Sequence, residues 1–434
     1  MNRMQYLKEF IKYTTSNVLG MFGLSCYILA DTYFISKGLG ANGLTALNLA
    51  IPVYSFIHGS GLMLGMGGAT RYSIYQSQKK VQNANIIFTN VIYTTALLAS
   101  IFLLMGLFLS EEITAALGAD AEVFAMTNTY LKVIMIFAPI FMMNEVLICF
   151  VRNDGNPQLT MCAMLSGSLA NIMLDYIFIF PMHLGIFGAV FATGFAPVIS
   201  MSILSLHLQK GKNQFHLVKT GIDCRMILKT LSLGFPSLIA EVSSGIVIIV
   251  FNIIILRLQG NVGVAAYGVI ANLSLVVVAI YTGVAQGTQP LISSAYGCGD
   301  QKNIRQVLRY AMAAMLMISC VVYLAVFLFA EPITSIFNSE NNLLLQKIAV
   351  PGLKLYFTSA AFVGFNIIIS VYFTSIERAV PAHIISLLRG LLVIVPMAFL
   401  LAKLCGIIGV WLAFPVTELL VAILGVGLYF IKGH

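Results

Sequence analysis

The feature that most constrains the fold is a series of long apolar stretches that occupies almost the entire chain. Each stretch reaches about 20 residues, the length that an α-helix needs to cross the hydrocarbon core of a bilayer. Of the 434 residues, 59% are hydrophobic and 9% are charged, whereas a soluble domain carries about 25% charged residues. The expected spans cover residues 14–36, 44–67, 84–109, 127–150, 158–180, 186–208, 230–256, 263–287, 306–330, 347–374, 381–401 and 406–431. We therefore predict an all-α integral membrane protein with twelve transmembrane helices.

Positive charge is distributed unevenly between the connections. Most of the 24 Lys and Arg residues lie in the N-terminal tail or in connections that lead from an even-numbered span to an odd-numbered one. The connections on the opposite side hold only Lys37, Lys132, Arg257, Lys347, Lys354 and Lys403. Since Lys and Arg accumulate on the cytoplasmic side of membrane proteins, both termini are expected in the cytoplasm and the protein in the plasma membrane. These are loop charges rather than a basic stripe on one folded face, so no nucleic-acid partner is expected.

The chain repeats itself with an offset of about 220 residues. The corresponding residues are Gly40, Gly43 and Ala46 with Gly260, Gly263 and Ala266, Pro157 with Pro381, and Gly185, Ile186 and Gly188 with Gly406, Ile407 and Gly409. Six spans in each half keep the halves in the same orientation, related by a pseudo-twofold axis along the membrane normal. Parallel repeats of this kind are typical of transporters. We predict an N-terminal six-helix bundle at residues 1–208, a cytoplasmic linker at 209–229 and a C-terminal six-helix bundle at 230–434.

Four polar residues of the first half are expected at one depth in the membrane. Asp31 and Asp175 each lie about five residues before the outer end of a span. Asn171 lies one turn deeper than Asp175 on the same helix face, and Thr193 lies about two turns into the sixth span. Two carboxylates, an amide and a hydroxyl suit a proton or a hard cation. The alternative is that each acid only forms a hydrogen bond with a neighbouring helix.

The second half does not repeat this set of residues. Instead, Glu241, Arg389 and Glu418 are expected near the middle of the membrane, as a polar cluster that is either a structural ion network or part of the transport machinery. Met63 and Met142 are candidates for an adaptable substrate cavity, because Met side chains fill irregular pockets.

Three further polar residues are interpreted as structural. Glu145 and Arg152 are seven residues apart on one helix face, which favours a structural ion pair between them. His58 is the single histidine of the second span and is assigned to packing.

Three segments resemble MATE (multidrug and toxic compound extrusion) transporters. Residues Leu29-Ala30-Asp31-Thr32 through Gly38-Leu39-Gly40 resemble the end of that family's first helix. Residues Asn171-Ile172-Met173-Leu174-Asp175 resemble its fifth-helix motif, and Gly185-Ile186-Phe187-Gly188-Ala189 with Ala192-Thr193 resembles the opening of its sixth helix. The resemblance covers nearly the whole chain and implies two six-helix bundles in a V-shaped arrangement.

The resemblance also implies functional residues. It places a cation site at Asp31, Asn171, Asp175 and Thr193, which would be a metal site only if the coupling ion is Na⁺. It makes Asn144 a candidate for contact with substrates. Two departures from the family pattern are the lack of a proline in residues 12–36 and the lack of an acid in residues 355–374.

The leading hypothesis is a secondary antiporter for multidrug efflux, which exports amphipathic, often cationic, small molecules in exchange for H⁺ or Na⁺. The excess of acids over bases inside the expected spans favours it. Small organic substrates and membrane lipids are the expected partners, and the protein is expected to be a monomer. A flippase for lipid-linked polyprenyl precursors is the alternative from the same broad superfamily. An enzyme is not expected, because no nucleophile–base arrangement, metal motif or phosphate loop is present, and no cofactor is expected beyond the coupling cation.

Overall fold

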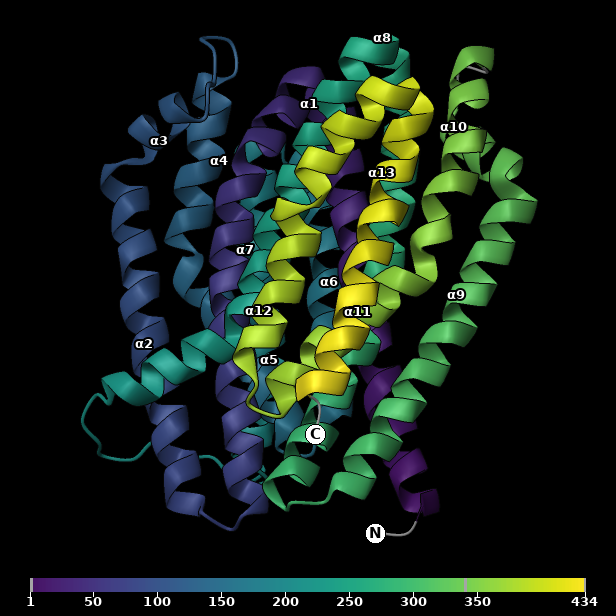
Figure 1. The fold of residues 1–434 in the computed structure, drawn as a ribbon. Coiled ribbons are helices and arrows are strands. Elements are labelled where there is room, and N and C mark those ends of the chain that lie inside the picture. The colour runs from purple at the N-terminus through teal and green to yellow at the C-terminus, as the bar shows by residue number, and fades with distance from the viewer. Residues whose placement is uncertain (1–2, 339–341, 433–434) are drawn as a thin grey trace.

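The computed structural model describes residues 3–338 and 342–432, which form helices joined by short connections (Figure 1). In chain order these are α1 (Arg3–Ser77), α2 (Val81–Phe108), α3 (Ser110–Ala116), α4 (Phe124–Ile136), α5 (Ala138–Asn153), α6 (Pro157–Ile179), α7 (Gly185–Gln209), α8 (Cys224–Gly297), α9 (Gln301–Phe337), α10 (Leu343–Tyr356), η1 (Phe357–Ser359), α11 (Ala360–Ser375), α12 (Ala379–Leu387), η2 (Leu388–Leu392) and α13 (Ile394–Lys432). Eight spans in the described residues are long and apolar enough to cross a membrane, and the bent pair α4–α5 makes a ninth. The prediction of an all-α integral membrane protein is confirmed.

Three of these spans contain a glycine at which two helices meet. Helix α1 turns at Gly40, α8 turns at Gly260 and α13 turns at Gly406, with φ angles of 68°, 62° and 58°. Glycine favours these positions because side chains with a Cβ rarely adopt a positive φ. Dividing the nine spans at the three glycines gives twelve segments, which is consistent with the expected number. Gly40 and Gly260 correspond in the sequence repeat and share a ψ of −158°, so the repeat extends to the backbone.

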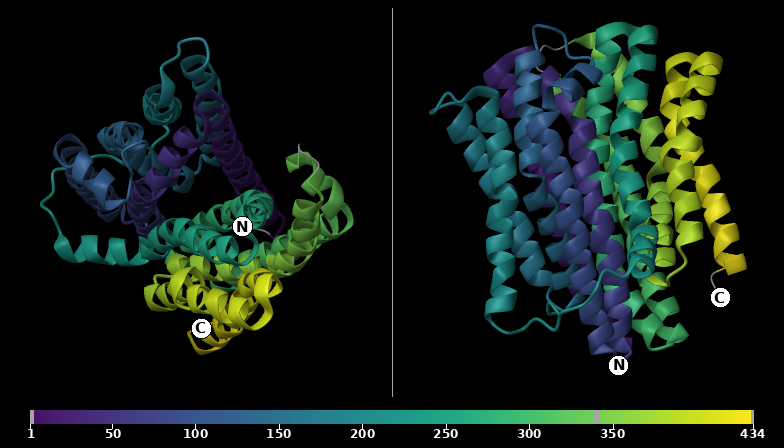
Figure 2. Two further views of the ribbon diagram at one scale, coloured as in Figure 1. Left: turned by 90° about the horizontal axis from the view of Figure 1, so that it is seen from above. Right: turned by 90° about the vertical axis from the view of Figure 1, so that its left-hand side faces the viewer.

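Each half of the chain has its own apolar core. One cluster of buried side chains extends from Ile35 to Phe215, and the other lies mainly between Phe251 and Val421. Viewed from above, the blue helices α2–α4 and the yellow helix α13 lie on different sides of the molecule (Figure 2). Phe10 is an exception, because this residue of α1 is buried in the second core.

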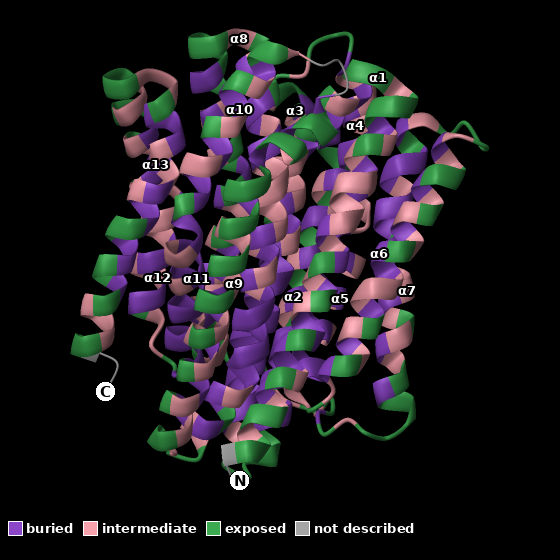
Figure 3. Ribbon diagram, turned by 90° about the vertical axis from the view of Figure 1, so that its right-hand side faces the viewer, coloured by how far each residue is buried: buried purple, intermediate pink, exposed green. Residues whose placement is uncertain are grey.

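The outer face of the molecule is apolar as well. Helix α9 has exposed residues along its length (Figure 3). The exposed apolar side chains of its middle part are Leu316, Met317, Val321, Leu324, Phe327 and Leu328. Soluble monomers rarely expose a continuous apolar stripe of this length, so this face is suited to contact with lipid.

The two halves approach each other most closely at the end of the bundle where both termini lie (Figure 1), here called the terminal end. A Cβ added to Gly67 would lie 2.0 Å from the carbonyl oxygen of Thr230, and one added to Gly234 would lie 1.8 Å from that of Met63. Farther from this end, a Cβ on Gly245 would meet its nearest atom, on Ile51, at 3.6 Å. Glycine therefore permits backbone contact between the halves at the terminal end.

Buried polar contacts reinforce this junction. Arg152 of α5 has no exposed surface, and its guanidinium donates to Asn17 Oδ1 at 2.9 Å and to Gln286 Oε1 at 2.8 Å. Gln289 of α8 donates to Thr70 Oγ1 at 3.1 Å. Arg152 thus bonds across the two halves, and the predicted pair with Glu145 is wrong. Two helical turns separate those residues, and closer acceptors are available to the arginine.

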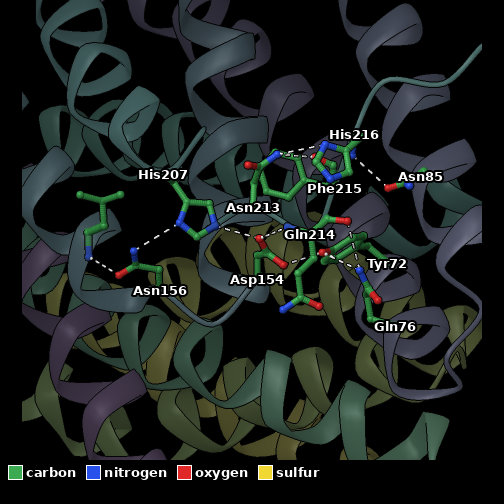
Figure 4. A network of polar contacts seen from close by, with 11 residues as sticks. Tyr72, Gln76, Asn85, Asp154, Asn156, His207, Asn213, Gln214, Phe215 and His216 are labelled. Carbon is green, nitrogen blue, oxygen red and sulfur yellow. Dashed lines mark hydrogen bonds and ion pairs between the residues drawn. The ribbon is translucent and has the colours of Figure 1, made fainter. Parts of the chain in front are cut away.

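The connection between the halves, residues 210–223, is held against the first half by a polar network (Figure 4). The carboxylate of Asp154 accepts from Tyr72 Oη at 2.6 Å and from the backbone N–H of Gln214 at 2.8 Å, and it contacts His207 Nε2 at 2.8 Å. Asn85 Oδ1 accepts from the backbone N–H of a residue in the same connection at 2.9 Å. These hydrogen bonds hold the non-helical connection in place against the first half.

The glycine contacts predict that Gly234→Ala separates the halves at the terminal end. Its added methyl overlaps the backbone of α1, which costs about 1–3 kcal/mol if the contact is retained. The separation is measurable as the yield of a disulfide between Ser77→Cys and the native Cys298, whose Sγ lies 3.6 Å from the Ser77 carbonyl oxygen. We expect Gly234→Ala to lower this yield in a chain whose other cysteines are replaced.

Gly268→Ala is the matched control, because a Cβ at that position of α8 meets no atom within 4 Å. An equal disulfide yield in the Gly234→Ala and Gly268→Ala variants would show that the close contact does not hold the halves together.

Candidate functional site

The site predicted in the first half depends on a close approach of α1 to α6. Three glycines of α1 face α6. A Cβ on Gly20 would lie 2.8 Å from Met164 Sδ, and one on Gly38 would lie 2.4 Å from Ile179 Cγ2. Because these positions lack side chains, Asp31 of α1 comes within reach of α6.

The four predicted residues lie together. Asp31 is 6% exposed and Thr193 is 5% exposed, while Asn171 and Asp175 are fully buried. The side chains of Asp31 and Asp175 are hydrogen-bonding neighbours. In the amide orientation that satisfies its surroundings, Asn171 donates to Asp175 Oδ2 at 3.0 Å and accepts from the backbone N–H of Thr193 at 3.3 Å.

No Lys, Arg or His side chain forms an ion pair with Asp31 or Asp175 in the described part of the chain. The Oδ1 atoms of both carboxyl groups are buried without a hydrogen-bond partner. Two adjacent buried carboxylates rarely both stay ionised unless a cation lies between them. The geometry can therefore hold a proton or a small cation with oxygen ligands.

A pair of tyrosines extends this site toward the middle of the molecule. Tyr27 lies one turn before Asp31 on α1, and its hydroxyl lies 3.0 Å from that of Tyr54. The ring of Tyr54 stacks on the imidazole of His58, with centroids 5.8 Å apart. Sequence reasoning missed these tyrosines because an aromatic residue in an apolar span gives no signal that distinguishes a polar contact from packing.

His58 lies between two acids from different halves of the chain. Its Nε2 is 3.4 Å from Glu145 Oε1, and its Nδ1 is 3.5 Å from Glu241 Oε2. Assigning His58 to packing alone was therefore wrong. An ionisable residue inside a span signals function by default, and the two nearby acids were visible in the sequence, but their approach to His58 depends on how the halves pack.

These three side chains line a pocket between the halves. Its other lining residues are Met21, Leu24, Ile28, Tyr54, Leu62, Ile148, Cys149, Met164 and Gln286. The three residues predicted for the substrate cavity, Met63, Met142 and Asn144, are not among these lining residues. Met142 is fully buried in the first core, and the backbone of Met63 lies at the contact with Gly234. Successive residues of a helix face directions about 100° apart, which explains why Glu145 lines the pocket and its neighbour Asn144 does not.

The predicted cluster in the second half is divided. Arg389 Nη2 lies 2.9 Å from Glu418 Oε1, and Asn366 of α11 donates to Glu418 Oε2 at 2.6 Å. Glu241 faces His58 instead. Arg389 belongs to the π-helical turn η2, and such turns interrupt α-helices often at functional sites. The paired charges and the added hydrogen bond make Glu418, at 1% exposure, a satisfied buried acid.

Comparisons with known proteins agree with this architecture. The family model described as MatE matches residues 17–177 and 236–400, one segment in each half. Curated relatives named multidrug export protein MepA occur in Staphylococcus saprophyticus, at 24% identity over 96% of this chain and 92% of the relative, and in Staphylococcus aureus, at 26% identity with the same coverage.

Solved structures share the fold. One is described as a crystal structure of MATE in complex with MaL6, with a TM-score of 0.93 and 23% identity over 100% of this chain and 98% of that chain. Another is described as a MOP superfamily transporter from Pyrococcus furiosus with reversed polarity of its binding pocket, with a TM-score of 0.90, 22% identity and the same coverage. These similarities establish the fold.

The Arg389–Glu418 pair predicts that Arg389→Ala lowers the free energy of unfolding by about 3–5 kcal/mol, because it leaves a buried carboxylate without its counter-charge. The measurement is thermal or denaturant unfolding of the purified protein. The double variant Arg389→Leu with Glu418→Leu is the control and should recover most of the stability. If the double variant is as unstable as the single one, lost packing rather than unpaired charge explains the effect.

Proposed function

Because the chain belongs to the MatE family, whose members are transport proteins rather than enzymes, we propose that it is a secondary antiporter of the plasma membrane. In this proposal it exports amphipathic, often cationic, organic molecules in exchange for H⁺ or Na⁺. The name of its staphylococcal relatives, multidrug export protein, supports a role in multidrug efflux.

The observation that carries the proposal is the pair of buried carboxyl groups at Asp31 and Asp175. An ionisable side chain within a membrane costs about 2.5–3.5 kcal/mol on insertion scales, and no basic side chain compensates these two in the described structure. A proton or Na⁺ would remove one unit of negative charge from the same pair. Asn171 would hold Asp175 in place through its amide N–H, and Thr193 would supply a further oxygen atom. The site can then exchange one cation for another.

Neutralising the pair would change how α1 packs. Asp31 lies on α1, and Asp175 lies on α6, so their mutual repulsion depends on whether a cation is bound. Helix α1 also forms the close contact with α8 at the terminal end. A cation bound at Asp31 and Asp175 can therefore influence the junction of the halves through one helix.

Alternating access requires that junction to open and close. If both termini are cytoplasmic, as the distribution of Lys and Arg predicts, the contacts at Gly67 and Gly234 close the cytoplasmic side. Their separation would expose the pocket to the cytoplasm, where substrate is collected. Backbone contacts through glycine are suited to this change, because they form and break without long side chains.

The flippase alternative is not favoured. A lipid-linked polyprenyl precursor is anionic and would need a basic cavity. Arg389 already pairs with Glu418, and the pocket between the halves contains two acids.

The proposal predicts that Asp31→Asn and Asp175→Asn each reduce ion-driven export to the level of empty liposomes. Either change removes one charge that the cation neutralises, while an amide of the same size preserves the fold. The assay is transport of ethidium in proteoliposomes under an imposed H⁺ or Na⁺ gradient. Thr193→Ala should have a milder effect, because a hydroxyl only assists the carboxylates.

Glu112→Gln, on the exposed surface of α3, is the matched control and should transport like the wild type. Full gradient-driven export by either Asn variant would exclude the shared site.

The proposed orientation predicts that residues 209–229 face the cytoplasm. A thiol reagent that does not cross membranes should fail to label Lys219→Cys from outside intact cells, and it should label the same variant after the membrane is opened. Ready labelling from outside would reverse the orientation and the assignment of the closed side.

A further inference from the structure

His58, Glu145 and Glu241, here called the central triad, form a second charged group that the proposed coupling site does not use. They come from three spans: His58 from the second part of α1, Glu145 from α5 and Glu241 from α8. Two of them belong to the first half and one belongs to the second half. The side chains of His58 and Glu145 are 12% exposed, and that of Glu241 is 33% exposed.

The contacts within the central triad are loose. The imidazole nitrogens lie 3.4 and 3.5 Å from the nearest carboxylate oxygens, which is longer than the usual range of a charge-assisted hydrogen bond. Nδ1 of His58 is buried and has no hydrogen-bond partner. By contrast, Arg389 and Glu418 are 2.9 Å apart, with Asn366 as an additional donor. The central triad therefore retains unused capacity for a polar ligand.

The pocket beside the central triad has the composition of an amphiphile site. Its remaining walls are mainly aliphatic and thioether side chains, of which Met21, Leu24 and Met164 are examples. Thioether side chains adapt to ligands of different shape. The pocket volume of about 60 Å³ suits one small group, since pockets for whole drug-sized ligands measure about 300–1,000 Å³.

We propose that the central triad binds the cationic group of the transported substrate, and that an ammonium entering between Glu145 and Glu241 replaces the proton on His58. This inference rests on the proposed function. It adds the residues that hold the positive charge of the substrate, and it narrows the substrates to monocations with a compact, accessible ammonium group.

The exchange conserves charge. With both carboxylates ionised and the imidazole protonated, the central triad carries one net negative charge. When the ammonium enters and one proton leaves an imidazole nitrogen for the solvent, the net charge is unchanged. The membrane interior therefore gains no uncompensated charge from the substrate, which would otherwise be the largest obstacle to binding.

The surroundings of His58 allow this exchange. The charged groups that face it are Glu145 from α5 and Glu241 from α8, and Tyr54 of α1 stacks on its ring. Arg152 lies two turns from Glu145 along α5 and donates hydrogen bonds to Asn17 and Gln286. With both carboxylates ionised, the imidazolium of His58 is the group of the central triad that carries an exchangeable proton, so His58 is the group that releases one.

The test is calorimetry on the full chain in lipid nanodiscs with phenyltrimethylammonium and its uncharged isostere tert-butylbenzene. Titrations in buffers of different ionisation enthalpy count the protons released. We expect the wild type to release up to one proton per bound phenyltrimethylammonium at mildly acidic pH. Glu145→Gln and Glu241→Gln should each weaken this binding at least about tenfold, while binding of tert-butylbenzene stays the same.

His58→Gln should bind phenyltrimethylammonium without proton release, and its affinity should no longer depend on pH. His58→Asn is the second variant if the first does not fold, and Glu112→Gln is the matched acid-to-amide control. No binding to the wild type, binding without proton release, or unchanged affinity in both Glu→Gln variants would overturn the proposal. Equal weakening of the charged and the uncharged ligand would also overturn it, because it indicates a distorted pocket.

This experiment separates the inference from the proposed antiport. If the Gln variants bind like the wild type while Asp31→Asn abolishes ion-driven export, the central triad is rejected and the antiporter proposal stands. If wild-type export depends on no ion gradient, the antiporter proposal fails irrespective of the binding data.

Discussion

Charge held in a medium that cannot hydrate it is the constraint on which the rest of this structure depends. The described spans contain three groups of acids, and their negative charge is compensated in a different way in each group. Glu418 has a permanent counter-charge in Arg389. Glu145 and Glu241 share His58, whose charge is reversible. The carboxyl groups of Asp31 and Asp175 lie next to each other, and their negative charge is compensated only when a cation binds. The first group is suited to structure, and the other two are suited to exchange.

Helix α1 links the two exchangeable groups. Asp31 lies on its first part and His58 on its second, and the hydroxyl contact between Tyr27 and Tyr54 joins these parts across the turn at Gly40. The same helix packs by backbone against α8. In the proposed mechanism, the cation binds at Asp31 and the substrate binds at His58. Both residues lie on α1, the helix that also forms the junction of the halves. Coupling then needs no separate signalling path.

The sequence predicted the fold to the level of segments, because spans and internal repeats are properties of the chain itself. The set of Asp31, Asn171, Asp175 and Thr193 was predictable as well, since helical rise converts residue number into depth. The partners of Glu145 and Glu241 were not predictable in this way. Depth alone does not say which helix faces point at one another across the halves.

The misassigned residues have the same explanation. Met63, Met142 and Asn144 lie at plausible depths, but they do not line the pocket, because depth alone does not determine the direction in which a helix face points. Arg152 was matched to Glu145 within its own helix, whereas its real partners come from α1 and α8. The depth of a residue in its span was predictable from the sequence, whereas the helix faces that meet across the two halves were not.

The most direct test of the account is infrared difference spectroscopy of the protein in lipid, which detects protonated carboxyl groups. In the absence of other cations, the account predicts a carboxylic-acid signal from the pair Asp31 and Asp175. This signal should disappear when the bound proton is removed at high pH or replaced by Na⁺, and it should be altered in both Asp31→Asn and Asp175→Asn. A spectrum in which both residues are ionised with no cation bound, or in which neither replacement changes the carboxylic-acid signal, would contradict the account.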